Sequence, residues 1–292
     1  MYPTRRTCLA AALLPLAARA DGGLKVVVSF SILADLVRQI GGPFVQVATL
    51  VAPGKDLHGF EPRPSDAKAI AAADLFVVNG LGIDDAPLRL ARSVRTKRPP
   101  VVAAQDVKPR TMVAGNHRLI DPHAWQDVAN AGLYVRTLTA ALVVADPIHR
   151  AEYQSAAASY LSKLDALDAE VRAALAPIPR GQRRVVTTHD ALGYFGSAYG
   201  IDFLAPLGLS TDGEPSAKVM AALIKQIKQD RIRALFLENV GRDVLLETVA
   251  RETGVRIGGQ LFSDALSPAD GPATTYIDMI RHNTAMIVGA LR

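Results

Sequence analysis

Three histidines share a sequence context that suits them to bind a transition metal. His58, His123 and His189 each lie between a strand-like segment and the start of a predicted helix. Asp264 follows the strand-like segment that ends at Phe262. Three neutral imidazoles and one carboxylate form a nitrogen and oxygen ligand set that suits Zn²⁺. A single histidine in a loop is more often a hydrogen-bonded structural residue, so the prediction depends on the shared context of all three.

The remaining three histidines lack this context. His149 and His282 fall within predicted helices, and neither has a metal-binding partner four residues on, so we interpret each as a surface or capping residue. His117 lies in the segment 106–120, which we expect to be a loop. There it faces solvent or serves as a weak outer ligand.

Several acidic residues could orient the histidines. A metal-binding imidazole usually donates its second N–H to a carboxylate or a carbonyl. The acidic residues near a histidine or at another strand end are Asp56, Asp121, Asp190 and Glu238. Each of them could equally cap a helix or a turn. We interpret Trp125 as a packing residue.

Binding is favoured over catalysis. A catalytic zinc typically has three protein ligands and an open position for water, whereas a fourth protein ligand closes the shell. A hydrolase or lyase would need Asp264 off the metal and Glu238 as a general base. The sequence has no H-E-x-x-H motif, no nucleophile elbow and no glycine-rich phosphate loop. A purely adhesive or structural role would not require such residues at strand ends.

The elements that must position these residues form two similar halves. Strand-like segments alternate with helices on both sides of a long central helix. The main predicted strands are 24–30, 45–51, 75–78, 101–103, 184–188, 234–238 and 256–262. This alternation predicts two α/β lobes with mainly parallel sheets, residues 21–145 and 178–292. Ligands of open α/β sheets bind at the carboxyl ends of the strands, where the candidate residues lie.

The predicted linking segment, 146–177, contains one long helix over 146–176. Asp146 is a good N-cap, and Pro147 fits the first helical position. Apolar residues recur at three- and four-residue spacing from Tyr153 to Leu175, and prolines at 177 and 179 end the helix. At about 1.5 Å per residue it spans about 45 Å. The alternative is a hairpin helix inside one domain.

The N-terminus resembles a cleavable export signal, residues 1–20. Arg5 and Arg6 precede a short apolar core, and an A-x-A site ends at Ala20. Cleavage near Ala20 predicts a periplasmic protein. The arginine pair leaves Sec and twin-arginine export both open. Cys8 precedes the apolar core, which argues against a lipid anchor at the cleavage point. We expect no later stretch to span a membrane.

Charge and cysteine content narrow the possible partners. Removing the signal lowers the net charge from +5 to +2, because three arginines and no acids leave. Aromatic residues make up 5% of the chain and are not interleaved with arginines, so we expect no nucleic-acid partner. The only cysteine leaves with the signal, so imidazole and carboxylate must bind any transition metal.

Motifs along the whole mature chain resemble one family in order. They are 56–66 (DLHGFEPRPSD), 121–125 (DPHAW), 188–195 (THDALGYF), 214–216 (EPS), 261–266 (LFSDAL) and 271–276 (GPATTY), with Asn283 beyond them. In these motifs the chain resembles the periplasmic zinc- and manganese-binding proteins that serve ABC-type metal importers.

The resemblance implies a fold, a site and a function. It implies two α/β lobes joined by one rigid helix, with the metal in the cleft between them. It implies His58 and His123 as ligands from the first lobe, and His189 and Asp264 from the second. The partners implied are a divalent metal ion and the membrane permease of an ABC importer, and we expect a monomer.

The third ligand bears on the choice of metal. In the family it tends to be histidine in zinc-type members and a carboxylate in manganese-type members, so His189 favours Zn²⁺. Manganese or iron is the alternative. Many zinc members carry a long histidine- and acid-rich loop before the second ligand. The segment 106–120 is short and has only His117, which argues against auxiliary zinc capture there.

Overall fold

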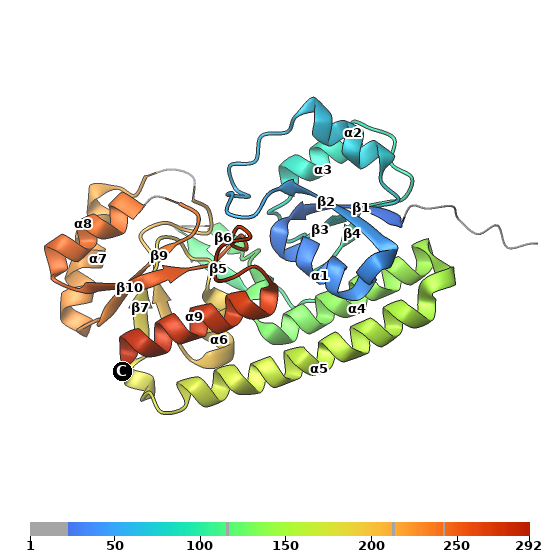
Figure 1. Ribbon diagram of the computed structural model, residues 1–292. Coiled ribbons are helices and arrows are strands. Elements are labelled where there is room, and N and C mark those ends of the chain that lie inside the picture. Colours follow the sequence, from blue (N-terminus) through green and yellow to red (C-terminus); the bar gives the residue numbers. More distant parts are fainter. Residues whose placement is uncertain (1–22, 115–116, 212–213, 242) are drawn as a thin grey trace, which may run out of the picture.

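Two α/β lobes lie side by side above one long helix (Figure 1). The computed structural model describes residues 23–114, 117–211, 214–241 and 243–292. The predicted signal peptide and Cys8 lie outside the described residues. The expected class, two lobes with parallel sheets and a long helix, is confirmed.

The N-terminal lobe contains a four-stranded parallel sheet in the order β2-β1-β3-β4. The strands are β1 (Leu24–Phe30), β2 (Val45–Val51), β3 (Leu75–Val78) and β4 (Val101–Val102). The α-helices are α1 (Ser31–Gly41), α2 (Pro64–Ala72), α3 (Asp85–Arg92) and α4 (Val128–Ala145). Six of the seven residues of β1 and all of β3 are buried. Such continuous apolar runs are typical of parallel strands covered on both faces.

The C-terminal lobe repeats this architecture with the order β10-β9-β7-β8, again parallel. Its strands are β7 (Arg184–Val186), β8 (Asp202–Leu204), β9 (Ala234–Glu238) and β10 (Arg256–Leu261). Its helices are α6 (Gly193–Tyr199), α7 (Ala217–Asp230), α8 (Asp243–Thr253) and α9 (Tyr276–Leu291). Because β9 lies between β7 and β10, its last residue, Glu238, lies between the segments that carry His189 and Asp264.

The long helix α5 (Arg150–Leu175) contacts helices α1 and α4 of the first lobe and α6 and α9 of the second. Its buried residues keep the predicted spacing: Tyr153, Ala157, Tyr160, Leu164, Leu167, Val171 and Leu175. Helical residues begin at Pro147, as predicted, but Pro147–His149 forms a 3₁₀ turn and the α-helix itself begins at Arg150. The Asp146 carboxylate makes no backbone cap; it accepts a 2.8 Å hydrogen bond from the Tyr153 hydroxyl and lies 2.7 Å from His149 Nδ1.

The burial of α5 predicts the cost of truncating it. Leu167 is fully buried in the main core cluster, so Leu167→Ala is expected to lower the free energy of unfolding of the metal-free protein by about 2–5 kcal/mol. Chemical denaturation measures this change. Val144→Ala is the control, since 71% of Val144 is exposed. Equal effects of the two substitutions would show that α5 is not packed as described.

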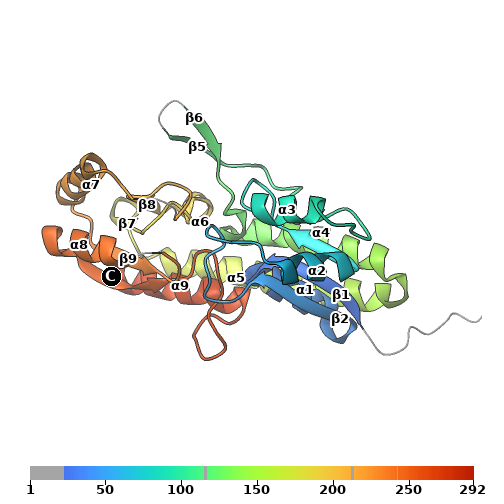
Figure 2. The same cartoon turned by 90° about the horizontal axis from the view of Figure 1, so that it is seen from above.

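A hairpin replaces part of the predicted 106–120 loop. Strands β5 (Thr111–Ala114) and β6 (His117–Ile120) pair antiparallel and extend away from the body (Figure 2). Leu119 is 41% exposed and Ile120 48%. The strands are short and bury little, so no apolar alternation marks them. The side chain of His117 lies outside the described part, and its predicted role stays a prediction.

Helix α4 is the one helix of the described residues with the length and apolar composition to cross a membrane. The expectation that no such stretch follows the N-terminus was therefore wrong by those two criteria. In the fold α4 packs against α1 and α5 and buries Tyr134, Val135 and Leu138, so its apolar character serves the core.

Hydrogen bonds from α1 and from the loop after β2 to the segment 266–276 tie the two lobes together. Ser31, the first residue of α1, accepts a 3.0 Å bond at its Oγ from the Leu266 N–H. Asp35 Oδ2 accepts a 2.8 Å bond from the Tyr276 N–H. The Leu266 carbonyl accepts a 2.9 Å bond from the Gly54 N–H. These bonds set where the loop carrying Asp264 lies relative to the first lobe.

Candidate metal centre

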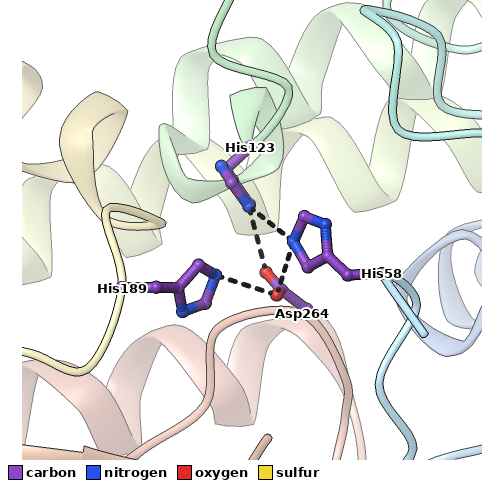
Figure 3. A group of neighbouring side chains, drawn as sticks. All are labelled: His58, His123, His189 and Asp264. Carbon is purple, nitrogen blue, oxygen red and sulfur yellow. Dashed lines mark hydrogen bonds and ion pairs between the residues drawn. The ribbon is translucent and has the colours of Figure 1, made fainter. Parts of the chain in front are cut away.

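Four side chains from both lobes converge on one point (Figure 3). One potential ligand atom from each of His58, His123, His189 and Asp264 lies within 4.8 Å of the others. Asp264 Oδ2 is 3.1 Å from His189 Nε2 and 3.4 Å from His58 Nε2, and Asp264 Oδ1 is 3.5 Å from His123 Nε2. Among the described residues this is the one group of three or more such side chains with this geometry.

The topology explains this convergence. His58 follows β2, His189 follows β7, and Asp264 follows β10, so each lies beyond the carboxyl end of a sheet strand. His123 differs from the prediction, because the strand before it is β6 of the hairpin and the element after it is a 3₁₀ turn, η2 (Ala124–Gln126). The two lobes each contribute two of the four side chains.

Burial sets His58 apart from the other three. The side chains of His123, His189 and Asp264 are fully shielded from solvent, while that of His58 is 9% exposed. Asp56 Oδ1 accepts a 2.8 Å bond from the His58 N–H, and Asp56 Oδ2 accepts a 2.6 Å bond from the Thr211 hydroxyl. Asp56 therefore braces the His58 loop against the second lobe and does not contact the imidazole.

Asp121 orients the ring of His123. Its Oδ1 lies 2.9 Å from His123 Nδ1 and also accepts a 3.0 Å bond from the His123 N–H. A carboxylate on Nδ1 favours a proton there and leaves the lone pair of Nε2 directed at the site. Asp121 is itself fully buried.

Glu238 orients His189 in the same manner. Its Oε2 lies 2.8 Å from His189 Nδ1, and its Oε1 accepts a 2.9 Å bond from the His189 N–H. Of the four acidic residues considered in the sequence, Asp121 and Glu238 contact imidazoles. The Asp190 N–H instead donates to the Gly208 carbonyl, and burial raises the pKa of the Asp190 carboxyl.

The Asp264 carboxylate is buried against the three imidazoles. Both oxygens are shielded from solvent, and ring nitrogens of His58, His123 and His189 lie within 3.5 Å of them. Burial acts to raise the pKa of Asp264, but the neighbouring His189 and His123 outweigh it and hold that pKa well below 3.8. Asp264 is therefore an anion whose oxygens face the three imidazoles, as a metal-ligating carboxylate requires.

The protonation of His189 follows from its two acidic neighbours. Burial acts to lower the pKa of this imidazole, yet Glu238 and Asp264 outweigh burial and raise the pKa well above 6.5. In the metal-free protein His189 consequently holds a proton between two carboxylates. His189 Nε2 can coordinate a metal ion only after this proton has left.

Side chains for which the sequence predicted no such role hold the loop that carries Asp264. Trp125 Nε1 and Gln126 Nε2 of the first lobe donate bonds of 2.9 and 2.6 Å to the Ser263 carbonyl. Asn283 holds both backbone groups of Phe262 through 2.8 Å bonds. Trp125 is thus more than a packing residue, although it is fully buried as expected.

The other described histidine rings lie outside this cluster. His149 Nδ1 lies 2.7 Å from Asp146 and its ring stacks on Phe44. His282 Nε2 is 3.0 Å from the Gln260 carbonyl. The interpretation of both as surface or capping residues agrees with these contacts.

Comparisons with known proteins agree with this architecture. The family described as "Zinc-uptake complex component A periplasmic" (ZnuA) matches residues 26–290. The manganese-binding lipoprotein MntA of Halalkalibacterium halodurans is 35% identical, over 93% of this chain and 90% of that protein. The iron-binding protein YfeA of Yersinia pestis is 32% identical, over 88% and 82%.

A solved structure gives the same fold. The periplasmic zinc-binding protein TroA from Treponema pallidum superimposes with a TM-score of 0.87 at 32% identity, covering 92% of this chain and 99% of that one. Sequence and fold agree over nearly the whole described chain. The chain therefore belongs to the ZnuA family, whose members are extracytoplasmic metal-binding proteins that serve ABC importers and are not enzymes.

Proposed function

We propose that this protein captures Zn²⁺ between its lobes through His58, His123, His189 and Asp264. The observation that carries the proposal is the buried Asp264 carboxylate, which faces three imidazole nitrogens, from both lobes, within 3.5 Å. A cation at this point would satisfy both oxygens. Four protein ligands of this kind form a closed shell, which suits a carried ion.

The donor set supports zinc over manganese. Three imidazole nitrogens and one carboxylate oxygen match the ligands of four-coordinate Zn²⁺, whereas Mn²⁺ prefers a larger shell dominated by oxygen. The full burial of three of the side chains also leaves little room for additional water ligands. Manganese or iron is the competing cargo, because relatives of similar identity are named for each of these metals.

Membership of the family supports a proposal for the route of the metal. We propose that residues 1–20 are a signal cleaved near Ala20, that the mature protein acts in the periplasm as a monomer, and that it delivers its ion to the permease of an ABC importer. In this proposal residues 21–145 and 178–292 are the two lobes and 146–177 the linker. His58 is the one partly exposed ligand, so the ion would enter and leave beside it.

Competition between metals tests the proposal. Zinc and manganese are titrated separately and against each other into metal-stripped mature protein. One zinc ion per chain should bind and displace manganese at equal concentration. His189→Ala should lower zinc affinity by about two orders of magnitude, because it removes one of four ligands.

His282→Ala is the matched control, since His282 contacts a backbone carbonyl away from the cluster and should leave the affinity unchanged. Preference for manganese would refute the choice of metal. Equal zinc affinities for His189→Ala and the wild type would refute the ligand set.

A further inference from the structure

Arg110 lies at the base of the β5–β6 hairpin, directly opposite Asp121. The Asp121 N–H donates a 2.9 Å bond to the Arg110 carbonyl, one step beyond the pairing of Thr111 with Ile120. The Arg110 guanidinium then reaches back, and its Nη1 donates a 2.8 Å bond to Asp121 Oδ2. Both contacts fix the residue that holds the His123 ring.

The two oxygens of Asp121 are thereby divided between two partners. Asp121 Oδ1 contacts the Nδ1 and the backbone N–H of His123, and Asp121 Oδ2 accepts the bond from Arg110. The Asp121 side chain is fully buried, and the Arg110 side chain is 31% exposed. A buried carboxylate needs a compensating cation, and Arg110 supplies it from the solvent side. Without Arg110 the carboxylate would lose its cation, and only the two contacts of Oδ1 with His123 would hold its orientation.

The second lobe holds Arg110 in place. A Cβ atom added at Gly193, the first residue of α6, would overlap the guanidinium of Arg110, so the arginine crosses α6 where there is no side chain. The Tyr194 hydroxyl accepts a 2.7 Å bond from the Arg110 N–H and donates a 3.3 Å bond to the Asp121 carbonyl. These contacts join the base of the hairpin to the opposite lobe.

We propose that Arg110 is a positioning residue for metal binding, which aligns the His123 ring by holding Asp121 and is itself kept in place by Gly193 and Tyr194 of the other lobe. The inference rests on the proposed function and adds a residue to it that does not touch the metal. It makes the alignment of a first-lobe ligand depend on the juxtaposition of the second lobe.

A double-mutant cycle tests this proposal. Zinc dissociation constants are measured by chelator competition for the wild type, Arg110→Met, Asp121→Asn and the double variant. Methionine keeps the apolar stem and removes the charged group. Arg110→Met and Asp121→Asn should each raise the dissociation constant about 10–100-fold, the usual effect of losing a partner of a metal ligand. The double variant should match Asp121→Asn within about twofold, because Arg110 acts through Asp121.

Gly193→Ala provides a second variant that keeps every charged group. The new methyl group meets the flexible end of Arg110, so the side chain can move aside without unfolding α6. This variant should also raise the dissociation constant about tenfold and change the visible absorption spectrum of bound Co²⁺. Arg184→Met is the control. Arg110 and Arg184 line one cavity of about 320 Å³, but Arg184 pairs with Asp202 and Asp230.

The outcomes separate the two proposals. Three results would overturn the role of Arg110. Arg110→Met and Gly193→Ala could both bind zinc with wild-type affinity. The increases in dissociation constant could multiply in the double variant, or Arg184→Met could weaken zinc binding as much as Arg110→Met does. If His123→Ala weakens zinc binding while Arg110→Met does not, the ligand set stands and only this inference fails. If His123→Ala binds zinc as the wild type does, both proposals fail.

Discussion

Asp264→Ala is expected to lower zinc affinity by about two to three orders of magnitude. Zinc held by four protein ligands is bound with about 10–16 kcal/mol, so one ligand corresponds to about 3 kcal/mol. Asp264 is the only carboxylate in the cluster and approaches all three imidazoles. Its loss also removes the negative charge that a dication needs in a buried site. Isothermal titration of the metal-stripped variant measures the change.

The control for this substitution is Asp270→Ala. Asp270 lies in the same segment between β10 and α9 but is exposed to solvent, so its removal tests the general effect of losing one negative charge from this loop. The melting temperatures of the metal-free proteins show whether Asp264→Ala folds. Zinc affinity within about threefold of the wild type in a folded Asp264→Ala protein would contradict the proposed site.

Zinc binding is expected to release about one proton per ion at neutral pH, and most of it comes from His189. Burial opposes protonation of this imidazole, but Glu238 and Asp264 raise its pKa well above 6.5. The proton must leave before Nε2 can bind the metal. Below the raised pKa, affinity should therefore fall by up to about tenfold for each unit of pH. As the pH is lowered, the affinity for zinc should therefore begin to fall at a pH above 6.5, the pKa of an unperturbed histidine.

The same shift determines how stability depends on pH. A histidine whose pKa is raised by folding stabilises the metal-free protein fully below pH 6.5, and this contribution is lost as the pH rises through the raised pKa. Zinc, in contrast, binds the deprotonated ring. The rise in melting temperature on adding zinc should consequently be larger at pH 8 than at pH 6.

Calorimetry in buffers of different ionisation enthalpy counts the released protons. Glu238→Gln keeps an acceptor for the His189 N–H but removes one of the two charges that raise the imidazole pKa. This variant should release fewer protons and show a shallower pH dependence near pH 7. Zinc binding without proton release at pH 7 in the wild type would contradict the protonated His189.

Much of the fold could be predicted from the sequence because its signals are local. The buried strands are continuous apolar runs, as in β1 and β3, and the face of α5 repeats at three- and four-residue spacing. The four side chains of the cluster were recognisable because three of them share a position after a strand. That they lie within 4.8 Å of one another is a property of the fold.

What the sequence did not reveal depends on contacts between distant segments. The first turn of the long helix is 3₁₀, and the Asp146 carboxylate before it contacts Tyr153 and His149, not the backbone of that turn. Trp125 was interpreted only as a packing residue. Its hydrogen bond to Ser263 joins the two lobes, and a contact between such distant segments leaves no local signal in the sequence. Arg110 carries no local signal at all: its partner Asp121 lies across a hairpin whose short strands were predicted to be a loop.

The most direct test of the ligand assignment is the X-ray absorption spectrum of the zinc-loaded protein at the zinc K-edge. The expected shell has three imidazole nitrogens and one carboxylate oxygen at about 2.0–2.2 Å, with no sulfur. The multiple-scattering features of imidazole count the histidines directly. A shell with two imidazoles or fewer, or a six-coordinate shell dominated by oxygen, would contradict a closed site formed by His58, His123, His189 and Asp264.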